Sequence, residues 1–222
     1  MNRAGCLATA LLVGSALAAC VVDPAASAPG AVAARRGEER LGGVAQRHSL
    51  SCESRSACDL LAAHGIAVDE DRFLARLPRS ANPDLGFVGE PDAPGGNVPP
   101  AAYGVHAEPV AATLRELGLP AEAVRGVDLA WLRSEMDAGR PVIVWATASL
   151  DPTPPVERID PQGRRFRAVP GEHTFLAIGR RGARIVLLDP ASGDARGVPE
   201  DVFDAAWATL GRSAVKAACP FR

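Results

Sequence analysis

Four residues that could together break an amide bond occur in the order Gln46, Cys52, His173 and Asp189. A cysteine thiolate can attack a carbonyl carbon, while an imidazole moves the proton and a carboxylate holds the imidazole in one tautomer. An amide N–H can stabilise the oxyanion that forms. We therefore predict nucleophilic catalysis, with Cys52 as nucleophile, His173 as acid and base, Asp189 as orienting carboxylate and Gln46 as oxyanion donor.

Cys52 is expected at the N-terminus of a helix over residues 52–64, which Ser51 can cap and Gly65 can end. The free N–H groups and the positive end of the dipole there favour the thiolate over the thiol, whose ordinary pKa is about 8.5. Glu53 lies in the first turn of this helix. We interpret it as a partner of the helix dipole and not as a second catalytic acid.

His173 and Asp189 are expected to meet across a β-hairpin. A turn centred on residues 181 and 182 pairs Gly179 with Arg184, which makes His173 a diagonal neighbour of Asp189. A turn one residue shorter places the two directly opposite. Either register lets the carboxylate bind one ring nitrogen, so that the other can face the cysteine sulfur.

Helical patterns come first along the chain and strand patterns second. The helical patterns cover residues 52–64, 69–77, 109–117, 128–136 and 199–210, and the strand patterns cover residues 141–147, 173–179 and 184–188. Residues 82–100 and 148–171 are expected to form loops beside them. This order, without an internal repeat, predicts an α+β domain in which N-terminal helices pack on a C-terminal antiparallel sheet.

The N-terminus shows the features of an export signal. A basic start at Arg3 precedes an apolar run over residues 7–17 and small residues before Cys20, and the run is too short to span a membrane. Leu17-Ala18-Ala19-Cys20 resembles a bacterial lipobox, which implies that Cys20 becomes the lipidated first residue of a protein anchored to the outer face of a bacterial membrane. The alternative is cleavage near Ala28, which would leave a soluble secreted protein.

These signals divide the chain into three segments. The expected segments are a signal peptide over residues 1–19, the lipidated cysteine with a flexible linker over residues 20–43, and the catalytic domain over residues 44–222. The linker is rich in Ala, Pro, Ser and Gly and then charged, without an apolar period that could build a core.

Three cysteines would remain in the mature domain, in an oxidising compartment, and they cannot all pair. Because the nucleophile Cys52 should stay free, a disulfide between Cys58 and Cys219 is expected. The alternative is that Cys58 and Cys219 are small buried hydrophobic residues.

Nucleic acid is not an expected partner, because the formal net charge is −2 and no Lys/Arg block is present. No metal or cofactor is expected either. The cluster of His48, Cys52, Cys58 and His64 lacks a Cys-x2-Cys pair, and the six-residue steps between Cys52, Cys58 and His64 scatter these side chains around a helix.

Several motifs resemble the C39 peptidase domain, and especially its stand-alone C39-like branch. They are Gln46-x5-Cys52, Ser51-Cys52-Glu53-Ser54, Asn82-Pro83-Asp84-Leu85-Gly86-Phe87-Val88-Gly89, Gly104-Val105-His106, Glu172-His173, Asp189-Pro190, Gly193 and the helix from Phe203 to Trp207. Together they cover about residues 45–211. The resemblance implies a papain-like fold, with the same four residues in the roles given above.

The best-known C39 members are fused to a transporter and cut bacteriocin leaders after a double glycine. This chain shows neither a transmembrane bundle nor a Gly-x-x-x-x-Gly-Lys-Ser/Thr motif. We therefore expect hydrolysis of a peptide or protein substrate, without leader processing coupled to export.

Two other functions use the same fold. One is a cell-envelope amidase or an acyl or peptidyl transferase with the same catalytic residues. The other is an inactive, lipid-anchored binding domain, in which Cys52 would be inert or disulfide-bonded. The presence of a candidate for each of the four catalytic roles favours the peptidase.

Overall fold

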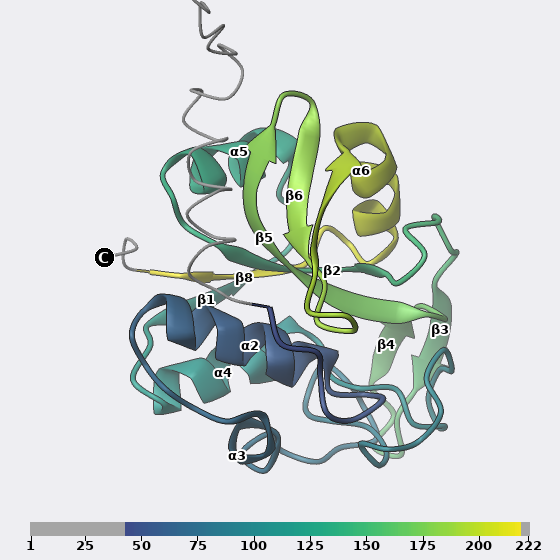
Figure 1. Ribbon diagram of the computed structural model, residues 1–222. Helices are drawn as coiled ribbons and strands as arrows, with labels where there is room; N and C mark the ends of the chain where they lie inside the picture. Colours follow the sequence, from purple (N-terminus) through teal and green to yellow (C-terminus); the bar gives the residue numbers. More distant parts are fainter. Residues whose placement is uncertain (1–42, 219–222) are drawn as a thin grey trace, which may run out of the picture.

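The computed structural model of the protein describes residues 43–218 (Figure 1). The expected signal peptide, the lipidated Cys20, almost all of the linker and Cys219 lie outside these residues, so they stay predictions. No helix in the described part is long and apolar enough to cross a membrane.

Helices lie on both faces of one antiparallel sheet, so the predicted α+β class is correct. The helices are α2 (Cys52–Ala63), α3 (Glu70–Leu74), α4 (Ala107–Glu116), α5 (Leu129–Asp137) and α6 (Glu200–Thr209). The six-stranded sheet has the order β1 (Ala121–Val124), β8 (Ala214–Ala217), β2 (Val142–Thr147), β5 (Glu172–Arg181), β6 (Arg184–Leu188) and β7 (Ala195–Pro199). A separate two-stranded ribbon consists of β3 (Val156–Ile159) and β4 (Arg165–Ala168).

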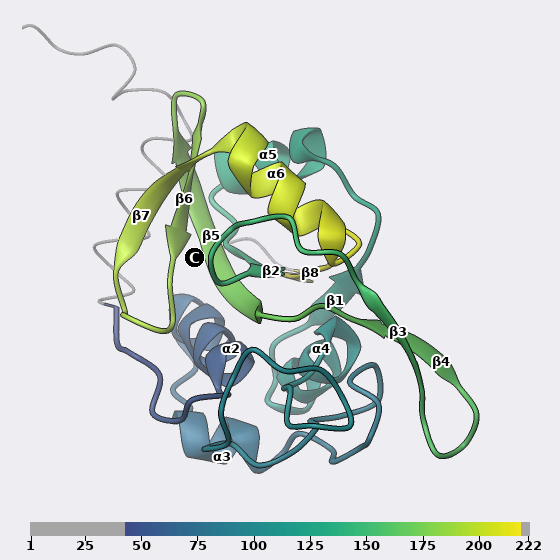
Figure 2. The same cartoon turned by 90° about the vertical axis from the view of Figure 1, so that its right-hand side faces the viewer.

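The central strands β2 and β5 carry an apolar core on each face. Because successive side chains of a strand point to opposite faces, Leu176 and Ile178 of β5 join the core beneath α2 and α4, whereas Phe175 and Ala177 join the core beneath α5 and α6. Figures 1 and 2 show these two helix pairs on opposite sides of the sheet. The sheet therefore holds α2, which begins at Cys52, against one face of β5.

The start of α2 was predicted correctly, but its cap was not. The helix begins at Cys52 and ends at Ala63, near Gly65, whose φ of +76° suits a glycine. Ser51 occupies the N-cap position, yet its hydroxyl makes no capping bond. That hydroxyl donates instead to Glu70 Oε1, at 2.5 Å, because the chain before α2 packs against the start of α3.

The β5–β6 hairpin has a different register from the predicted one. Arg184 pairs with Arg181 and not with Gly179, so the connecting loop is only Gly182 and Ala183. A register shift between Ala177 and Gly179 then moves the pairing by one residue. When the register of the Leu176–Leu188 pair is continued by one residue, Asp189 lies opposite Phe175. His173 is therefore still a diagonal neighbour of Asp189, on the same face of the sheet.

Two loop predictions had different outcomes. Residues 82–100 contain no helix or ladder in the structure, only an isolated bridge from Phe87 to Arg79 and another from Val88 to Gly104. Residues 148–171 were predicted as a loop but contain the β3–β4 ribbon, which extends away from the main sheet in Figure 2. Asp160 at its tip is buried and accepts a bond from Asn82 Nδ2 at 3.1 Å, which ties the ribbon to the long loop.

Candidate active site

The sulfur of Cys52 lies in a buried carboxyl environment. Cys52 is 6% exposed, and its Sγ donates a hydrogen bond to Glu53 Oε2 at 3.3 Å. Burial raises the pKa of the Cys52 thiol well above its ordinary value, and the nearby charges of Glu53 and Glu172 raise it further, while the backbone N–H of Thr174 lowers it. Against the expectation drawn from the helix N-terminus, burial and the two neighbouring carboxyl groups therefore disfavour the thiolate in this structure.

Glu53 is seated inside the protein and does not face solvent as a simple partner of the helix dipole would. It has no exposed surface, and its Oε1 accepts a hydrogen bond from the backbone N–H of Val105 at 2.6 Å. A Cβ at Gly104 would lie 2.2 Å from the same oxygen, so the backbone at Gly104 leaves room for the carboxylate. Burial raises the pKa of Glu53 to about 7, although the hydrogen bonds from Val105, from its own N–H and from Cys52 act against this rise.

Glu172, at the start of β5, completes the cluster. Its pKa is raised well above the ordinary value by burial and by the negative charge of Glu53, and its Oε1 is buried without a hydrogen-bond partner in the described chain. One ligand atom each from Cys52, Glu53 and Glu172 lies within 4.8 Å of the others. Both oxygens of Glu53 already accept hydrogen bonds. We therefore interpret the cluster as groups that share protons and not as a metal centre.

The predicted pairing of His173 with Asp189 is present. His173 Nε2 lies 2.9 Å from Asp189 Oδ1, and the same oxygen accepts the backbone N–H of Ala191 at 3.0 Å. Burial opposes ionisation of Asp189, but the His173 bond and charge, the Ala191 N–H and the charge of Arg196 hold its pKa below the ordinary value. This bond holds the imidazole in one orientation through its Nε2 atom.

The cysteine and the histidine are not directly joined. No hydrogen bond links Cys52 Sγ to His173 within residues 43–218. His173 packs edge-on against Phe175 at 4.8 Å between ring centroids, on the α5–α6 side of β5. Thr174 points toward α2, where its hydroxyl lies 3.1 Å from Ser56 Oγ. The site therefore consists of two parts, a thiol–carboxyl cluster and a His–Asp pair. Consecutive residues of β5 belong to them, Glu172 to the cluster and His173 to the pair.

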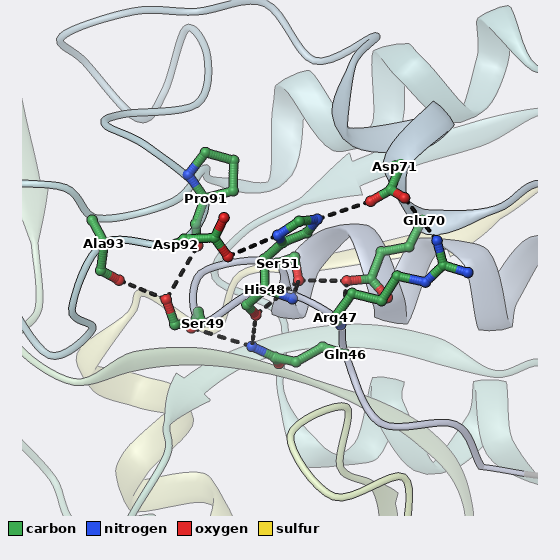
Figure 3. A network of polar contacts seen from close by, with 10 residues as sticks. All are labelled: Gln46, Arg47, His48, Ser49, Ser51, Glu70, Asp71, Pro91, Asp92 and Ala93. Atoms are coloured by element: carbon green, nitrogen blue, oxygen red, sulfur yellow. Dashed lines mark hydrogen bonds and ion pairs between the residues drawn. The ribbon is translucent and has the colours of Figure 1, made fainter.

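Gln46 lies beside the His–Asp pair but does not offer its amide to it. Its backbone N–H donates to the carbonyl of Pro190 at 2.7 Å, which brings the segment before α2 next to Asp189. The side-chain Nε2 donates to the carbonyls of His48 and Ser49, at 2.7 and 3.2 Å, as Figure 3 shows. The side-chain amide of Gln46 thus donates only to carbonyl groups of the segment before α2 in this structure. Its role as oxyanion donor stays a prediction.

The same segment is held by His48. Its Nε2 lies 2.8 Å from Asp71 Oδ1 and its Nδ1 lies 2.8 Å from Asp92 Oδ1, so one ring bridges α3 and the long loop (Figure 3). The bonds to Asp71 and then Asp92 raise the pKa of His48 above 6.5, because they favour the protonated ring.

Cys58 is a buried free thiol in the core beneath α2, and burial raises its pKa to about 12. Its predicted disulfide partner, Cys219, lies outside the described residues. In its surroundings Cys58 matches the alternative interpretation of a small buried hydrophobic residue.

A cavity of about 270 Å³ lies beside the C-terminal end of α6 and strand β2, and none of the four predicted catalytic residues lines it. Its wall includes His106, Trp145 and Ser213. Trp145 pairs across the strands with Thr174, whose N–H faces the thiol, and its indole donates to Val105 O at 3.0 Å. Trp145 is thus shared between the wall of this cavity and the strand pair that carries Thr174.

A helix with a cysteine at its N-terminus, packed on an antiparallel sheet that carries a His–Asp pair, defines the class of papain-like proteins. The chain belongs to the Peptidase C39-like family, whose family model matches residues 42–215. No curated protein matches the sequence. The fold is similar to the crystal structure of a protein from Bacillus anthracis provisionally described as a C39-like peptidase, with a TM-score of 0.69 and 22% identity over 80% of this chain and 92% of that one.

Neither glutamate of the cluster was predicted to contact the thiol, since Glu53 was interpreted as a partner of the helix dipole and Glu172 was noted only as part of a motif. A signal was nevertheless present, since one glutamate directly follows the candidate nucleophile and another directly precedes the candidate histidine. The inward direction of Glu53 could not be read from the sequence, because it depends on Gly104 and Val105, far away along the chain.

We predict that Gly104→Ala lowers the free energy of unfolding by more than about 2 kcal/mol, because a Cβ there would meet Glu53 and the φ of +115° disfavours alanine. Gly118→Ala is the matched control, since its φ is +91° but nothing lies within 4 Å of an added Cβ. Urea unfolding measures both variants. An equal cost in the two would contradict the close fit around Glu53.

We also predict that the contribution of His48 to stability depends on pH. Because the folded pKa is raised above 6.5, this contribution is complete below about pH 6.5 and is lost as pH rises through the folded value. His48→Asn should therefore cost less than about 1 kcal/mol at pH 5.5, since the pairs are partly exposed, and still less at pH 9. Urea unfolding of both proteins at the two pH values tests this, and an equal cost at both would contradict it.

Proposed function

We propose that the protein is a thiol peptidase in which Cys52 is the nucleophile. The observation that carries the proposal is the 2.9 Å bond from His173 to Asp189, which fixes the His173 imidazole. The next residue, Thr174, turns its backbone N–H toward the Cys52 sulfur. Membership of the C39-like family and the papain-like fold support peptide-bond chemistry.

In the proposed reaction, His173 takes the proton of the Cys52 thiol as the sulfur attacks the carbonyl carbon of a peptide bond, and a tetrahedral oxyanion forms. The N–H of Cys52 at the start of α2 has no carbonyl partner within the helix, so it and the helix dipole can stabilise that charge. His173 then gives a proton to the leaving amine through Nδ1, while Asp189 holds the ring. Water later hydrolyses the thioester and restores the free cysteine.

Gln46 is the proposed second oxyanion donor. For this role its amide must leave the carbonyls of His48 and Ser49, to which it donates in the structure. The bond from the Gln46 N–H to Pro190 already places the residue beside the His–Asp pair.

The proposed location is the outer face of a bacterial membrane, with Cys20 as the lipid attachment point. The support for this part is the lipobox-like sequence and the composition of the linker. The substrate is accordingly proposed to be an extracytoplasmic peptide or protein.

An inactive binding domain is the second candidate. The observation that favours it is the buried Cys52 thiol, which donates to a carboxylate and has no bond to His173 in the described structure. The two candidates differ in one measurable property, because only the peptidase turns over a peptide through Cys52.

We predict that Cys52→Ala abolishes peptide hydrolysis without loss of the fold, and that His173→Ala lowers it by at least about 10²-fold, the usual contribution of an acid–base group. Hydrolysis of a library of internally quenched peptides measures activity, and circular dichroism checks the fold. Cys58→Ala is the control, because this second buried thiol lies in the apolar core. Activity that survives Cys52→Ala would refute the proposal, and a native protein without activity would favour the binding domain.

For Gln46→Ala we predict a loss of turnover on the order of 10²-fold, which is typical for removal of one oxyanion donor. The unfolding midpoint should change little relative to this loss. If Gln46 only braces the segment before α2, the same variant would lower the unfolding midpoint and leave the turnover of the folded fraction unchanged. That second result would contradict the oxyanion role.

A further inference from the structure

The cavity of about 270 Å³ beside β2 and α6 has a basic and apolar wall. The ionisable side chains of the described chain that line it are all basic, namely Arg125, Arg167 and His106. Most of the remaining wall is apolar and includes Trp145 and Leu210. A concave, mostly apolar surface with a few polar groups is the usual form of a small-ligand site. The wall of this cavity therefore suits a ligand that has an apolar body and a negative charge.

This cavity lies at the same end of the sheet as the His–Asp pair. Trp145 of β2 pairs with Thr174 of β5, and the Trp145 N–H donates to the carbonyl of Ser213 at 3.2 Å, just before β8. Neighbouring strands of a sheet lie about 4.8 Å apart. The two wall residues Trp145 and Ser213 are therefore about one and two strands, roughly 5 and 10 Å, from the part of β5 that carries His173.

The wall is also joined to the groups that surround the thiol. The Trp145 indole donates to the carbonyl of Val105 at 3.0 Å, and the Val105 N–H donates to Glu53 at 2.6 Å. His106, the residue after Val105, lines the cavity. An extended peptide advances about 3.3 Å per residue. A peptide that is held at Cys52 can therefore place a group that is about two or three residues from the attacked bond in the cavity.

Both arginines keep N–H groups that no other group of the described chain binds. Arg125 donates to Asp84 through Nη2 alone, at 2.5 Å, and Arg167 donates to Glu157 through Nε alone. A guanidinium carries five N–H donors, so several remain on each side chain. Neither acidic partner lines the cavity. The side chains of Arg167 and Glu157 are 73% and 56% exposed, and such a surface pair contributes little, so another carboxylate can compete for Arg167.

His106 shapes the wall but has no ring nitrogen left for a ligand. Its Nδ1 lies 2.8 Å from Asp84 Oδ1, and its Nε2 lies 3.3 Å from the hydroxyl of Tyr103. The same oxygen of Asp84 accepts the bond from Arg125, so one carboxylate outside the cavity holds two residues of its wall. The two arginines are therefore the charged donors that a ligand can use.

We propose that this cavity is a substrate subsite in which Arg125 and Arg167 bind a carboxylate that lies about two or three residues from the bond attacked by Cys52. The inference rests on the proposed peptidase function and names its substrate class, a peptide with a carboxylate near the cleaved bond. That carboxylate belongs to an acidic side chain or to the C-terminus of the peptide. Guanidinium groups match the planar geometry of a carboxylate, and the apolar wall takes the methylene groups beside it.

The decisive comparison uses internally quenched peptides that differ only in Glu against Gln at one position. We expect wild-type kcat/KM to be about 10-fold or more higher for the Glu peptide at the selected position, since a hydrogen bond to a charged group has this size. Arg125→Gln and Arg167→Gln should each bring the Glu-to-Gln ratio close to one. Arg167→Glu should replace the preference for Glu by a preference for Lys. The same peptides with a free or an amidated C-terminus distinguish a terminal carboxylate from a side-chain carboxylate.

Arg165→Gln is the matched control. Arg165 is an exposed arginine two residues before Arg167 on β4, it does not line the cavity, and its loss changes the net charge of the protein by the same amount. This variant should keep the wild-type preference. The proposal is overturned if the wild-type protein prefers neither the Glu peptide nor the free C-terminus. It is also overturned if Arg165→Gln removes the preference as fully as Arg167→Gln does, because the preference would then reflect the overall charge.

A binding measurement tests the subsite without catalysis. The ¹⁵N-labelled protein would be titrated with three probes: N-acetylglutamic acid α-amide, N-acetylleucine and the neutral N-acetylglutamine amide. We expect a saturable shift of the Gly211 and Ser213 amide signals with at least one of the two acids and none with the neutral amide. The shift should be lost when Arg125→Gln and Arg167→Gln are combined. No saturable shift with either acid would overturn the proposal.

The two measurements also separate this inference from the proposed function. Binding of an acid at the cavity by a protein that cleaves no peptide would refute the peptidase and leave the carboxylate site standing. Hydrolysis that needs Cys52 but shows neither a preference for a carboxylate nor binding of either acid would refute the present inference alone.

Discussion

The burial of one sulfur beside two carboxyl groups is the constraint on which the rest of the site depends. An isolated buried carboxylate is costly unless hydrogen bonds compensate it, so Glu53 needs both the thiol and the Val105 N–H. Gly104 leaves the room that this arrangement requires. The second carboxyl group, Glu172, makes the local negative charge still less favourable. The result is a neutral thiol at the N-terminus of a helix, a position where a thiolate would otherwise be favoured.

Strand β5 brings the parts of the site together through three consecutive residues. Glu172 joins the thiol cluster, His173 joins Asp189, and Thr174 turns its N–H toward Cys52 and its side chain toward α2. Because neighbouring residues of a strand point to opposite faces, one short stretch can serve both halves of the site. The beginning of β5 also extends beyond the paired part of β6, which covers β5 only from residue 176 onward. Helix α2 can therefore reach this end of the strand.

Much of the architecture could be predicted because its signals are local. The starts of α2 and α5 were predicted from residues a few positions apart. The predicted hairpin also brought His173 next to Asp189, although its register was wrong by up to two residues. Short strands such as β1 and β8 were missed, since a strand of four residues is too short to show a clear alternation of apolar and polar side chains. The buried position of Glu53 was also missed, because a sequence shows that a glutamate lies in a first turn but not that a distant glycine makes room for it.

Covalent trapping tests the central claim most directly. The protein would be mixed with a library of peptide methyl esters and quenched in acid, which preserves a thioester. Trypsin cleavage at Arg55 then separates Cys52 from Cys58 before mass spectrometry. The account predicts acyl groups on the peptide that contains Cys52 and none on the peptide that contains Cys58. Ester hydrolysis that proceeds without any acyl group on Cys52 would contradict it.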